Sequence, residues 1–312
     1  MPVSDNPNLL EDEGEEDRTV LVQARKILRA QAAEFRDRYL LVRIEGESLG
    51  QVTLLGQNEI VIGRAQTANV CVLDSGVSRH HARLLKTRKS YMLQDMGSAN
   101  GTYVGGQPVI AEKELADGDI IQLGPSVMFR YSVTDADQQA MLEHLYDASV
   151  TDALTNAHNR EYFDSRLASE LAYARRHEAP LSLIILDIDH FKHINDTYGH
   201  RVGDQALVNL VRTARPALRT EDVFCRYGGE EFAIILRTTD VEQAACVAER
   251  VRVIVSEMRV DVGSSSVGLT VSLGCASLKC CESLTAESLI SVADRRLYIA
   301  KNSGRNRVVW AG

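Results

Sequence analysis

Two acidic segments in the C-terminal half carry side chains that can hold a divalent metal ion. Asp187 and Asp189 end the apolar run LSLIIL. Glu230 and Glu231 follow the glycine pair of RYGGEEF, between the apolar runs VFC and AIIL, which predicts a β-hairpin with carboxylates at its tip. Residues two apart in a strand share a face, so both aspartates should point one way while Ile188 offers its carbonyl. Such oxygen ligands on two adjacent strands suit Mg²⁺.

The elements that must position these carboxylates form an α/β region. Beyond Thr151, helical stretches alternate with strand-like runs such as LSLIILDID, VFCRY, EFAIIL and LTVSLGCASL. Residues 38–134 differ, because short β-rich runs alternate there with Gly, Asn, Asp and Ser turns, as in an all-β sandwich. Residues 135–150 are predicted to form a linker helix with a short apolar face. We therefore predict a multidomain chain, with an all-β sandwich at 38–134 followed by an α/β domain at 151–312.

The N-terminal tail and the composition limit the classes of function. Six of residues 11–17 are acidic, which predicts a disordered tail over 1–37 with a short helix between Thr19 and Arg36. The net charge of −8 argues against a nucleic-acid partner, and no apolar run is long enough for a bilayer. The start lacks a signal-peptide pattern, and six cysteines without a C-x-x-C pair argue against a zinc site. We expect a cytoplasmic protein that binds neither membrane nor nucleic acid.

Four short motifs in the all-β region carry groups that bind phosphate. They are Gly63-Arg64, Ser78-Arg79-His80-His81, Asp95-Met96-Gly97-Ser98 and Asn100-Gly101-Thr102. Arginine forks and serine hydroxyls can bind phosphate oxygens, and an asparagine amide can bind a peptide backbone. Taken one by one, the glycines and the asparagine are also compatible with ordinary turns, and Arg64 with a solvated surface charge.

In order and spacing these four motifs resemble those of forkhead-associated (FHA) domains. The resemblance covers about residues 38–133 and implies a site for phosphothreonine peptides, with His81 holding the loops in place. By position, the expected peptide-binding residues are Arg64, Ser78, Arg79, Ser98 and Asn100.

The acidic tail offers one candidate ligand for such a domain. Thr19 is the only threonine before Thr53, and Val22 takes the third position after it, which FHA domains often read. Phosphorylation by a Ser/Thr kinase would add a charge of about −1.5 to −2 and could order the tail against two arginines. Two alternatives stay open: a phosphopeptide from another protein, and a tail that is never modified.

Four motifs in the α/β region resemble GGDEF-type diguanylate cyclases. They are DALTNAHNR (152–160), DIDHFKHINDTYGHRVGD (187–204), RYGGEEF (226–232) and ADRRLYIAKNSGRNRV (293–308). The resemblance spans essentially 151–312 and implies a central antiparallel sheet flanked by helices, related to nucleotide-cyclase and polymerase palm domains. The chain departs from the family at Asn156 and Ala157, where a glycine and an apolar residue are usual, which could alter the coupling between linker helix and domain.

The resemblance also implies an active site for GTP. Asp187, the Ile188 carbonyl and Glu230 are expected to hold two Mg²⁺ ions, with Mn²⁺ as an alternative. Glu231 is expected to assist the ribose 3′-hydroxyl, or else to bind a metal ion. Metal ions in such a site neutralise triphosphate charge and lower the pKa of the attacking hydroxyl.

The remaining substrate contacts are expected from helical segments. Asn195 and Asp204 would recognise guanine, whose N1 and N2 donors match a carboxylate. Lys192, Lys301 and Arg305 would bind the β- and γ-phosphates, and Phe191 is also expected to contact GTP. Asp204 could also cap a helix that starts at QALVNLV, and the two basic residues near Gly304 could instead stabilise a helix C-terminus.

The segment Arg219-Thr220-Glu221-Asp222 matches an R-x-x-D motif that, in the family, binds the product and inhibits the enzyme. The resemblance assigns Arg219 and Asp222 to cyclic di-GMP. The alternative is a surface ion pair, which contributes little free energy.

The implied reaction joins two GTP molecules into cyclic di-GMP and two pyrophosphates, so it needs two such domains facing each other in a homodimer. The linker helix could form the dimer stalk, and phosphothreonine binding could bias the geometry. The alternative from another class is a silent effector that senses cyclic di-GMP or GTP and recruits phosphorylated partners. A cyclase with a different base preference is a third possibility.

Overall fold

The computed structural model describes residues 38–46, 48–263 and 265–311. The predictions for Thr19, the acidic tail and its short helix lie outside these residues. The chain divides into two compact units, one ending at His144 and the other beginning at Leu145. The division falls inside α2 (Ala136–Val150), a helix that Asp135 caps through a 2.8 Å bond from the Gln138 amide. None of the α2 side chains is buried.

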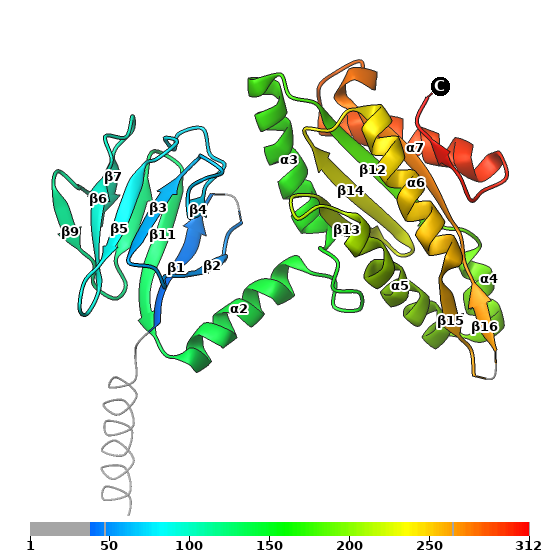
Figure 1. The fold of residues 1–312 in the computed structure, drawn as a ribbon, viewed down its shortest axis with the longest axis horizontal. Helices are drawn as coiled ribbons and strands as arrows, with labels where there is room; N and C mark the ends of the chain where they lie inside the picture. Colours follow the sequence, from blue (N-terminus) through cyan, green and yellow to red (C-terminus); the bar gives the residue numbers. More distant parts are fainter. Residues whose placement is uncertain (1–37, 47, 264, 312) are drawn as a thin grey trace, which may run out of the picture. The chain divides into compact units, whose positions relative to one another are not determined.

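The first unit is a sandwich of two β-sheets, which confirms the predicted all-β fold (Figure 1). One sheet has the order β2-β1-β11-β10-β7-β8 and the other β4-β3-β5-β6-β9. Inward-facing side chains from both sheets, including Ile62, Leu84, Tyr91, Phe129 and Tyr131, form one core. The strands are β1 (Arg38–Glu45), β2 (Val52–Leu54), β3 (Glu59–Gly63), β4 (Val70–Cys71), β5 (Ala82–Lys86), β6 (Tyr91–Asp95), β7 (Thr102–Val104), β8 (Gln107–Pro108), β9 (Glu112–Glu114), β10 (Ile120–Leu123) and β11 (Val127–Thr134).

The second unit is an α/β domain around a five-stranded sheet of order β13-β14-β12-β17-β18. Its pairing is antiparallel except between β17 and β18, and a separate hairpin joins β15 to β16. The helices are α3 (Arg160–His177), α4 (Phe191–Tyr198), α5 (His200–Ala214), η1 (Arg215–Ala217), α6 (Val241–Glu257), η2 (Leu278–Cys280) and α7 (Ala286–Asn302). The strands are β12 (Leu181–Ile188), β13 (Val223–Gly228), β14 (Glu231–Arg237), β15 (Arg259–Asp261), β16 (Ser266–Gly268), β17 (Val271–Ser277) and β18 (Val308–Val309).

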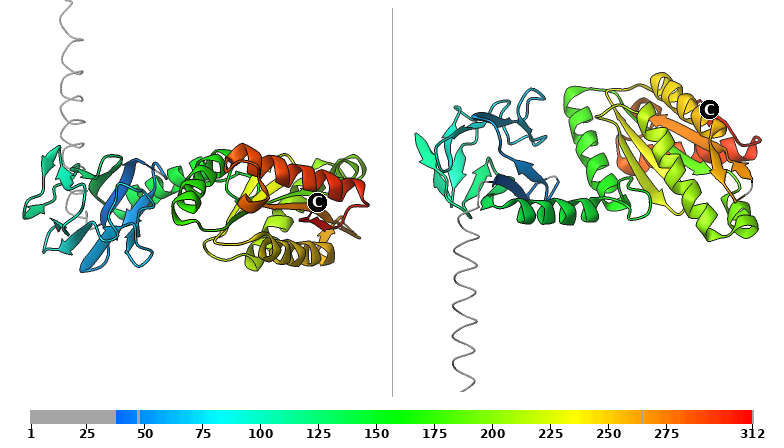
Figure 2. Two further views of the ribbon diagram at one scale, coloured as in Figure 1. Left: turned by 90° about the horizontal axis from the view of Figure 1, so that it is seen from above. Right: turned by 60° about the horizontal axis from the view of Figure 1, so that its bottom comes forward.

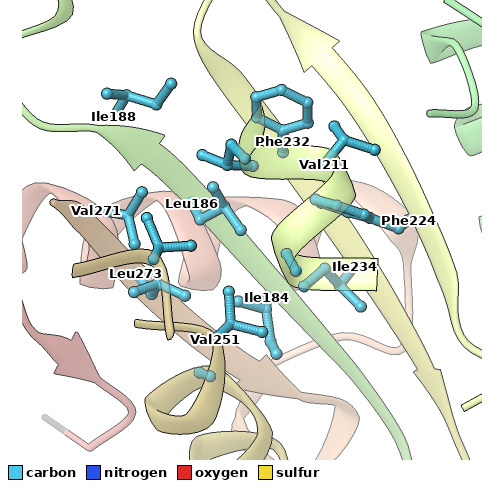
Figure 3. Close-up of a cluster of buried hydrophobic side chains, with 14 of the residues drawn as sticks. Ile184, Leu186, Ile188, Val211, Phe224, Phe232, Ile234, Val251, Val271 and Leu273 are labelled. Atoms are coloured by element: carbon cyan, nitrogen blue, oxygen red, sulfur yellow. The ribbon is translucent and has the colours of Figure 1, made fainter. Parts of the chain in front are cut away.

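Helices cover both faces of this sheet, and the alternation of the central strand explains why. In β12, Ile184 and Leu186 join a core with α4, α5 and α6 (Figure 3). Leu183 and Ile185 face the other way and pack against α3 and α7. Figure 2 shows α6 and α7 on opposite faces of the sheet. All eight β12 residues are therefore buried, which accounts for its continuous apolar sequence.

Candidate active site and phosphate-binding loops

The acidic hairpin forms as the sequence predicts. Gly228 pairs with Glu231, so Gly229 and Glu230 make a two-residue turn between β13 and β14. On the neighbouring strand β12, Asp187 lies directly opposite Glu231. The Ile188 amide also approaches the Glu230 carbonyl at 3.4 Å. The fold therefore brings the two acidic segments together at one end of the central sheet.

Asp187 carries a buried negative charge whose only salt-bridge partner among the described residues is Lys301. Its side chain is 7% exposed, and Oδ2 lies 2.8 Å from the Lys301 ammonium. Burial raises the Asp187 pKa to about 6, the nearby carboxylates of Glu230 and Glu231 act in the same direction, and Lys301 opposes them. The site thus holds more negative charge than one lysine balances, which is the electrostatic condition for binding a cation.

Asp189 has a different environment from Asp187, although it too is only 5% exposed. Its oxygens accept hydrogen bonds from the Thr270 hydroxyl at 2.7 Å, the Ser272 hydroxyl at 2.6 Å and the Asn306 amide at 3.0 Å. A carboxylate with three donors is already satisfied. Asp189 therefore ties β17 and the C-terminal segment to β12 rather than contributing to the acidic site.

The donor set of the acidic site fits a hard divalent cation, because it consists of carboxylate oxygens and an available backbone carbonyl. The described residues contain no ready-made cluster of three His, Cys, Asp or Glu side chains that would hold a metal ion. Asp187 and Glu230 would thus need the Ile188 carbonyl and substrate oxygens to complete a coordination shell. The Lys301 ammonium now lies where such a cation would neutralise Asp187.

Two predicted guanine contacts come from neighbouring helices, α4 and α5. A side chain at Gly203 would overlap the Asn195 Oδ1 atom, so the Asn195 amide lies against the first turns of α5. Asp204, the next residue, is exposed. Its interpretation as a helix cap is wrong, because α5 begins at His200 and the capping residue is Gly199 with φ 83°. Gly199 allows the left-handed bend between α4 and α5, so the helix starts five residues earlier than the sequence suggested.

The start of α4 leaves backbone donors available for an anion. His190 precedes it with φ 56° and makes no side-chain cap. The Phe191 ring is 7% exposed and packs in the core, so this residue can meet a phosphate only through its backbone amide. The Lys192 side chain is exposed.

Lys301 behaves differently from a simple helix-stabilising charge, and Arg305 lies just beyond the end of α7. Lys301 lies in the last turn but forms an ion pair with Asp187 of the sheet. Gly304, with φ 113°, reverses the chain after the helix, and Arg305, with φ 61°, donates its amide to the Ala300 carbonyl. The fold thus directs Lys301 to the acidic site, whereas the contact of Arg305 with substrate stays a prediction.

Arg226 is a residue that the sequence reasoning missed. One of its Nη atoms binds both carboxylate oxygens of Asp152, at 3.0 and 3.1 Å. Its Nε and second Nη donate to the Gly229 carbonyl at 2.9 and 2.8 Å. Arg226 therefore links the entry of the domain to the hairpin turn. Asn156 in the same entry loop has φ 57°, a conformation that asparagine tolerates in place of glycine.

The R-x-x-D segment forms a tight turn. The Arg219 amide donates to Asp222 Oδ2 at 2.8 Å, and the second Asp222 oxygen is buried without a hydrogen bond among the described residues. Burial raises the Asp222 pKa, and the neighbouring Glu221 contributes in the same direction. The positive charge of Arg250 in α6 acts in the opposite direction and lowers the Asp222 pKa. The sequence analysis did not include Arg250. The turn therefore presents an acceptor beside two guanidinium groups.

In the first unit, backbone pairing brings the phosphate-binding motifs together. The Arg64 amide donates to the Ser78 carbonyl at 2.9 Å, and the Ala65 amide donates to the Arg79 carbonyl at 3.0 Å. Gly63 is required at this crossing, because a side chain there would collide with the Arg79 carbonyl. The Arg64 Nε atom is buried and makes no hydrogen bond to the described protein atoms. Arg64, Ser78 and Arg79 thus share one edge of the sandwich.

The third and fourth motifs join the same edge. The Ser78 hydroxyl oxygen accepts from the Ala99 amide at 3.0 Å, which leaves its proton for another acceptor. The Asn100 amide donates to the Gly76 carbonyl at 2.9 Å. The Ser98 hydroxyl, by contrast, donates to Asp95 at 2.6 Å, so its proton is already engaged. Phosphate binding through the Ser98 hydroxyl would require that bond to break.

His81 holds these loops from inside. It is fully buried, its Nδ1 accepts from the Ser78 amide at 3.0 Å, and its Nε2 lies 3.0 Å from the Gly101 carbonyl. Since Gly101 has φ 76° and follows Asn100, this contact fixes the fourth motif relative to the second. The side chain therefore positions the loops, in agreement with its predicted structural role.

Comparison with known proteins assigns both units. A family model described as "Diguanylate cyclase, GGDEF domain" matches residues 149–307, and an FHA domain model matches residues 60–124. The chain belongs to the GGDEF diguanylate cyclase family and carries an FHA domain. The predicted fusion and both fold classes are thereby confirmed.

Curated relatives match the second unit. The response regulator PleD of Caulobacter vibrioides is 41% identical over 170 residues, which are 54% of this chain and 37% of that protein. The probable diguanylate cyclase DgcC of Escherichia coli is 43% identical over 159 residues, 51% of this chain and 42% of that protein. The chain therefore spans less than half the length of these relatives.

Solved structures match the same unit. Diguanylate cyclase SiaD of Pseudomonas aeruginosa, solved in complex with its activator SiaC, is 38% identical with a TM-score of 0.51 over 56% of this chain and 68% of that one. The coiled coil and GGDEF domain of DgcB from Caulobacter crescentus, solved with c-di-GMP, is 36% identical with a TM-score of 0.52 over 56% of this chain and 92% of that one.

Of the helices described here, none combines the length and hydropathy needed to cross a membrane.

Proposed function

We propose that this chain is a diguanylate cyclase that condenses two GTP molecules into cyclic di-GMP and two pyrophosphates. The observation that carries the proposal is the acidic site, where Asp187 and Glu231 lie opposite each other beside the Gly229-Glu230 turn. Lysine 301 reaches the same site from α7. This arrangement offers metal-binding oxygens, a candidate base and a phosphate-binding cation within one end of the sheet.

In the proposed site, the chain's own residues bind and orient GTP. Asn195 and Asp204 hold the guanine edge, and Phe191 and Lys192 offer an amide and an ammonium to the triphosphate. Glu231 accepts the proton of the ribose 3′-hydroxyl, and Asp187, Glu230 and the Ile188 carbonyl would hold two Mg²⁺ ions. When bound, these ions neutralise phosphate charge and acidify the attacking hydroxyl. Lys301 and Arg305 stabilise the β- and γ-phosphates as pyrophosphate leaves.

One domain binds one GTP, so the proposed reaction needs two copies of the chain. Each 3′-hydroxyl attacks the α-phosphate held by the partner, which makes the relative orientation of two catalytic domains the control point. We propose that the exposed helix α2 contributes to pairing. Its Met141 and Leu145 side chains are 64% and 53% exposed, which leaves apolar surface for a second copy.

The direct test incubates the purified chain with GTP and Mg²⁺ and separates the products by liquid chromatography. Wild type should form cyclic di-GMP, and Glu230→Ala should form none. An equal mixture of GTP and ATP tests base preference, and a product containing adenine would contradict the roles of Asn195 and Asp204. Omitting Mg²⁺ or replacing it by Mn²⁺ tests the cofactor.

We propose further that the FHA domain regulates the enzyme by binding a phosphothreonine peptide. Two observations support an anion at this edge of the sandwich. The buried Arg64 Nε has no hydrogen-bond partner among residues 38–46, 48–263 and 265–311, and the Ser78 hydroxyl accepts from the Ala99 amide, which leaves its proton for another acceptor. Phospho-Thr19 of the chain's own tail is one ligand, supplied by a Ser/Thr kinase, and a peptide from another protein is the other. A synthetic phospho-Thr19 peptide should bind wild type, and Arg64→Ala should abolish binding. Unchanged affinity in Arg64→Ala would refute the site.

We also propose product inhibition through Arg219 and Asp222. Their turn leaves one buried Asp222 oxygen without a hydrogen bond to the described protein atoms, next to Arg250. Arg219→Ala should leave the initial rate unchanged and remove the slowing that occurs as cyclic di-GMP accumulates. Persistent slowing in this variant would place product inhibition elsewhere.

The second candidate function is a silent effector that binds cyclic di-GMP or GTP without turnover. The intact hairpin and the buried Asp187 beside two further carboxylates favour catalysis, because clustered carboxylates with a raised pKa are common at catalytic sites. Stoichiometric binding of either nucleotide without any product, with and without phosphopeptide, would favour the effector.

A further inference from the structure

A pair of cysteines lies where β17 gives way to α7, at the opposite end of β17 from the acidic site. Cys280 closes the short helix η2 and Cys281 follows it, and both thiols are partly exposed. The Cys280 sulfur lies 3.4 Å from the Ser277 hydroxyl. The Cys281 thiol donates to the Ser277 carbonyl at 3.4 Å. The two sulfurs therefore share the end of β17 but have different partners.

A buried arginine faces this pair. Arg296 of α7 is only 6% exposed, and its Nη1 donates to the Cys275 carbonyl at 2.8 Å. Its Nε atom is buried and makes no hydrogen bond within the described part of the chain. No carboxylate forms a salt bridge with Arg296 among the described residues. A buried guanidinium in this situation is stabilised by a nearby anion.

The thiols differ in acidity because of these surroundings. Burial raises the pKa of the Cys280 thiol, but the hydrogen bonds from Ser277 and the proximity of the Arg296 guanidinium outweigh it, so the pKa lies below its usual range. Burial raises the pKa of Cys281, and the negative charge of Cys280 adds to this effect. Cys280 is thus the member of the pair that favours the thiolate, which is the reactive form.

We propose that Cys280 is an oxidation site whose thiolate form is favoured by contacts with Ser277 and Arg296 and reacts with hydroperoxides. The thiolate sulfur attacks the terminal peroxide oxygen, so that an S–O bond forms as the O–O bond breaks. The sulfur loses two electrons to the peroxide, and the departing alkoxide or hydroxide takes a proton from water. The product is a sulfenic acid on Cys280.

The geometry favours a sulfenic acid over a disulfide between the two neighbours. Adjacent Cα atoms lie about 3.8 Å apart across a trans peptide, whereas ordinary disulfides span about 4.4–6.8 Å. Cys281 is also held by its bond to the Ser277 carbonyl. The first product should therefore carry one added oxygen and remain reactive towards a 1,3-diketone probe.

The test uses the full chain and its own cysteines as controls. Protein is treated with hydrogen peroxide in the presence of dimedone, and peptide mass spectrometry measures labelling at each thiol over time. Cys71 and Cys246 are exposed, so accessibility alone would label them first, and Cys225 and Cys275 are buried. Fastest labelling at Cys280 is expected. Labelling of Cys246 before Cys280 would overturn the proposal.

Two variants separate activation of the thiol from its exposure. Ser277→Ala and Arg296→Gln should each slow labelling of Cys280 several-fold while labelling of Cys246 stays unchanged. Since Arg296 is buried, circular dichroism first establishes that the variant is folded, and Ser277→Ala provides the same test if it is not. Cys281→Ser should leave Cys280 labelling intact. Equal Cys280 rates in wild type and Ser277→Ala would contradict the proposed role of these partners.

Discussion

Asp95 of the FHA domain and Asp187 of the GGDEF domain both lie near strand ends, yet their pKa values are shifted in opposite directions. Asp95 accepts from the Gly97 and Ser98 amides, each at 2.9 Å, and from the Ser98 and Thr102 hydroxyls, each at 2.6 Å. Burial raises its pKa, but these four donors outweigh burial and the pKa is lowered. Asp187 has one cationic partner and two acidic neighbours, and its pKa is raised to about 6.

The Asp95 carboxylate stabilises a loop through its hydrogen bonds, whereas the Asp187 carboxylate has only Lys301 as a salt-bridge partner among the described residues and remains able to bind a ligand. Both Asp95 oxygens accept hydrogen bonds from the turn that leads to the fourth motif. Asp95 is therefore structural, even though it lies beside the proposed peptide site. Asp187 keeps acceptor capacity that the protein leaves largely unused, at a cost in stability. The FHA domain thus carries its proposed ligand-binding groups on loops fixed by Asp95 and His81, whereas the GGDEF domain carries its acidic groups at rigid strand ends.

The strongest test of this comparison is Asp187→Asn. Removal of a proposed metal ligand should lower cyclic di-GMP formation by roughly 10³-fold, since metal-ion stabilisation of the transition state amounts to several kcal/mol. The same change should stabilise the fold at neutral pH. The folded-state pKa of about 6 exceeds the reference value of 3.8, so the native state favours protonated Asp187, and stability is lost as pH rises through this window.

Unfolding by urea, followed by the fluorescence of Trp310 in the catalytic domain, measures this effect. Asp187→Asn should raise the unfolding free energy by about 2 kcal/mol at pH 7.5 and leave it nearly unchanged at pH 3.5. Trp310 is the single tryptophan of the chain, so the signal reports this domain alone. If Asp187→Asn were less stable than wild type at pH 7.5, the ionised Asp187 would not destabilise the fold, and the contrast with Asp95 would be wrong.

Asp95→Asn should change the unfolding free energy in the opposite direction to Asp187→Asn. Loss of a charged acceptor for four donors should lower the unfolding free energy of the FHA domain by about 2–3 kcal/mol at pH 7.5. Because the folded-state pKa is lowered, the stabilisation is present above the unfolded-state pKa and is lost as pH falls through the folded-state value. The difference between variant and wild type should therefore shrink in acid, as measured by circular dichroism. Cyclic di-GMP formation without phosphopeptide should stay unchanged.

Asp189→Asn sharpens the comparison within one domain. Its three donors make it a counterpart of Asp95, although it lies two residues from Asp187. The variant should lose about 1–2 kcal/mol of stability, because an amide can keep some of these hydrogen bonds but not all of them. Its loss of activity should be far smaller than that of Asp187→Asn. Activity as low as that of Asp187→Asn would place Asp189 in the active site.

The sequence predicted the two folds because strand and motif signals are local. Short β-rich runs between turn residues marked β1, β3, β5 and β6, and the apolar run LSLIIL marked β12 as a strand. Strands β8 and β9 were missed because their residues are exposed and leave no apolar pattern. The four FHA motifs could be recognised in the sequence because each loop carries its own polar residues.

The contacts that define the site were harder to predict from the sequence, because they join residues that are far apart along the chain. Nothing near Arg226 indicates that it binds Asp152, 74 residues away. The strand pattern alone treats Asp187 and Asp189 alike, and only the family resemblance selected Asp187. The physical difference comes from the fold, which places Lys301 beside Asp187 and Thr270 beside Asp189. The start of α5 was misplaced because the left-handed bend at Gly199 depends on how α4 packs.

The exposed helix α2 has a thermodynamic consequence. It contains 15 residues and buries none of them, while isolated helices of about 12–15 residues are only marginally stable in water. Taken alone, such a helix is close to helix–coil balance, and a change of about 1 kcal/mol, comparable to one capping contact such as that of Asp135, is enough to shift it. In this chain the last turn is also held by the Asn159 side chain, which donates to the Ser149 carbonyl at 2.7 Å. A connector near this balance changes its helical content in response to a small change in free energy.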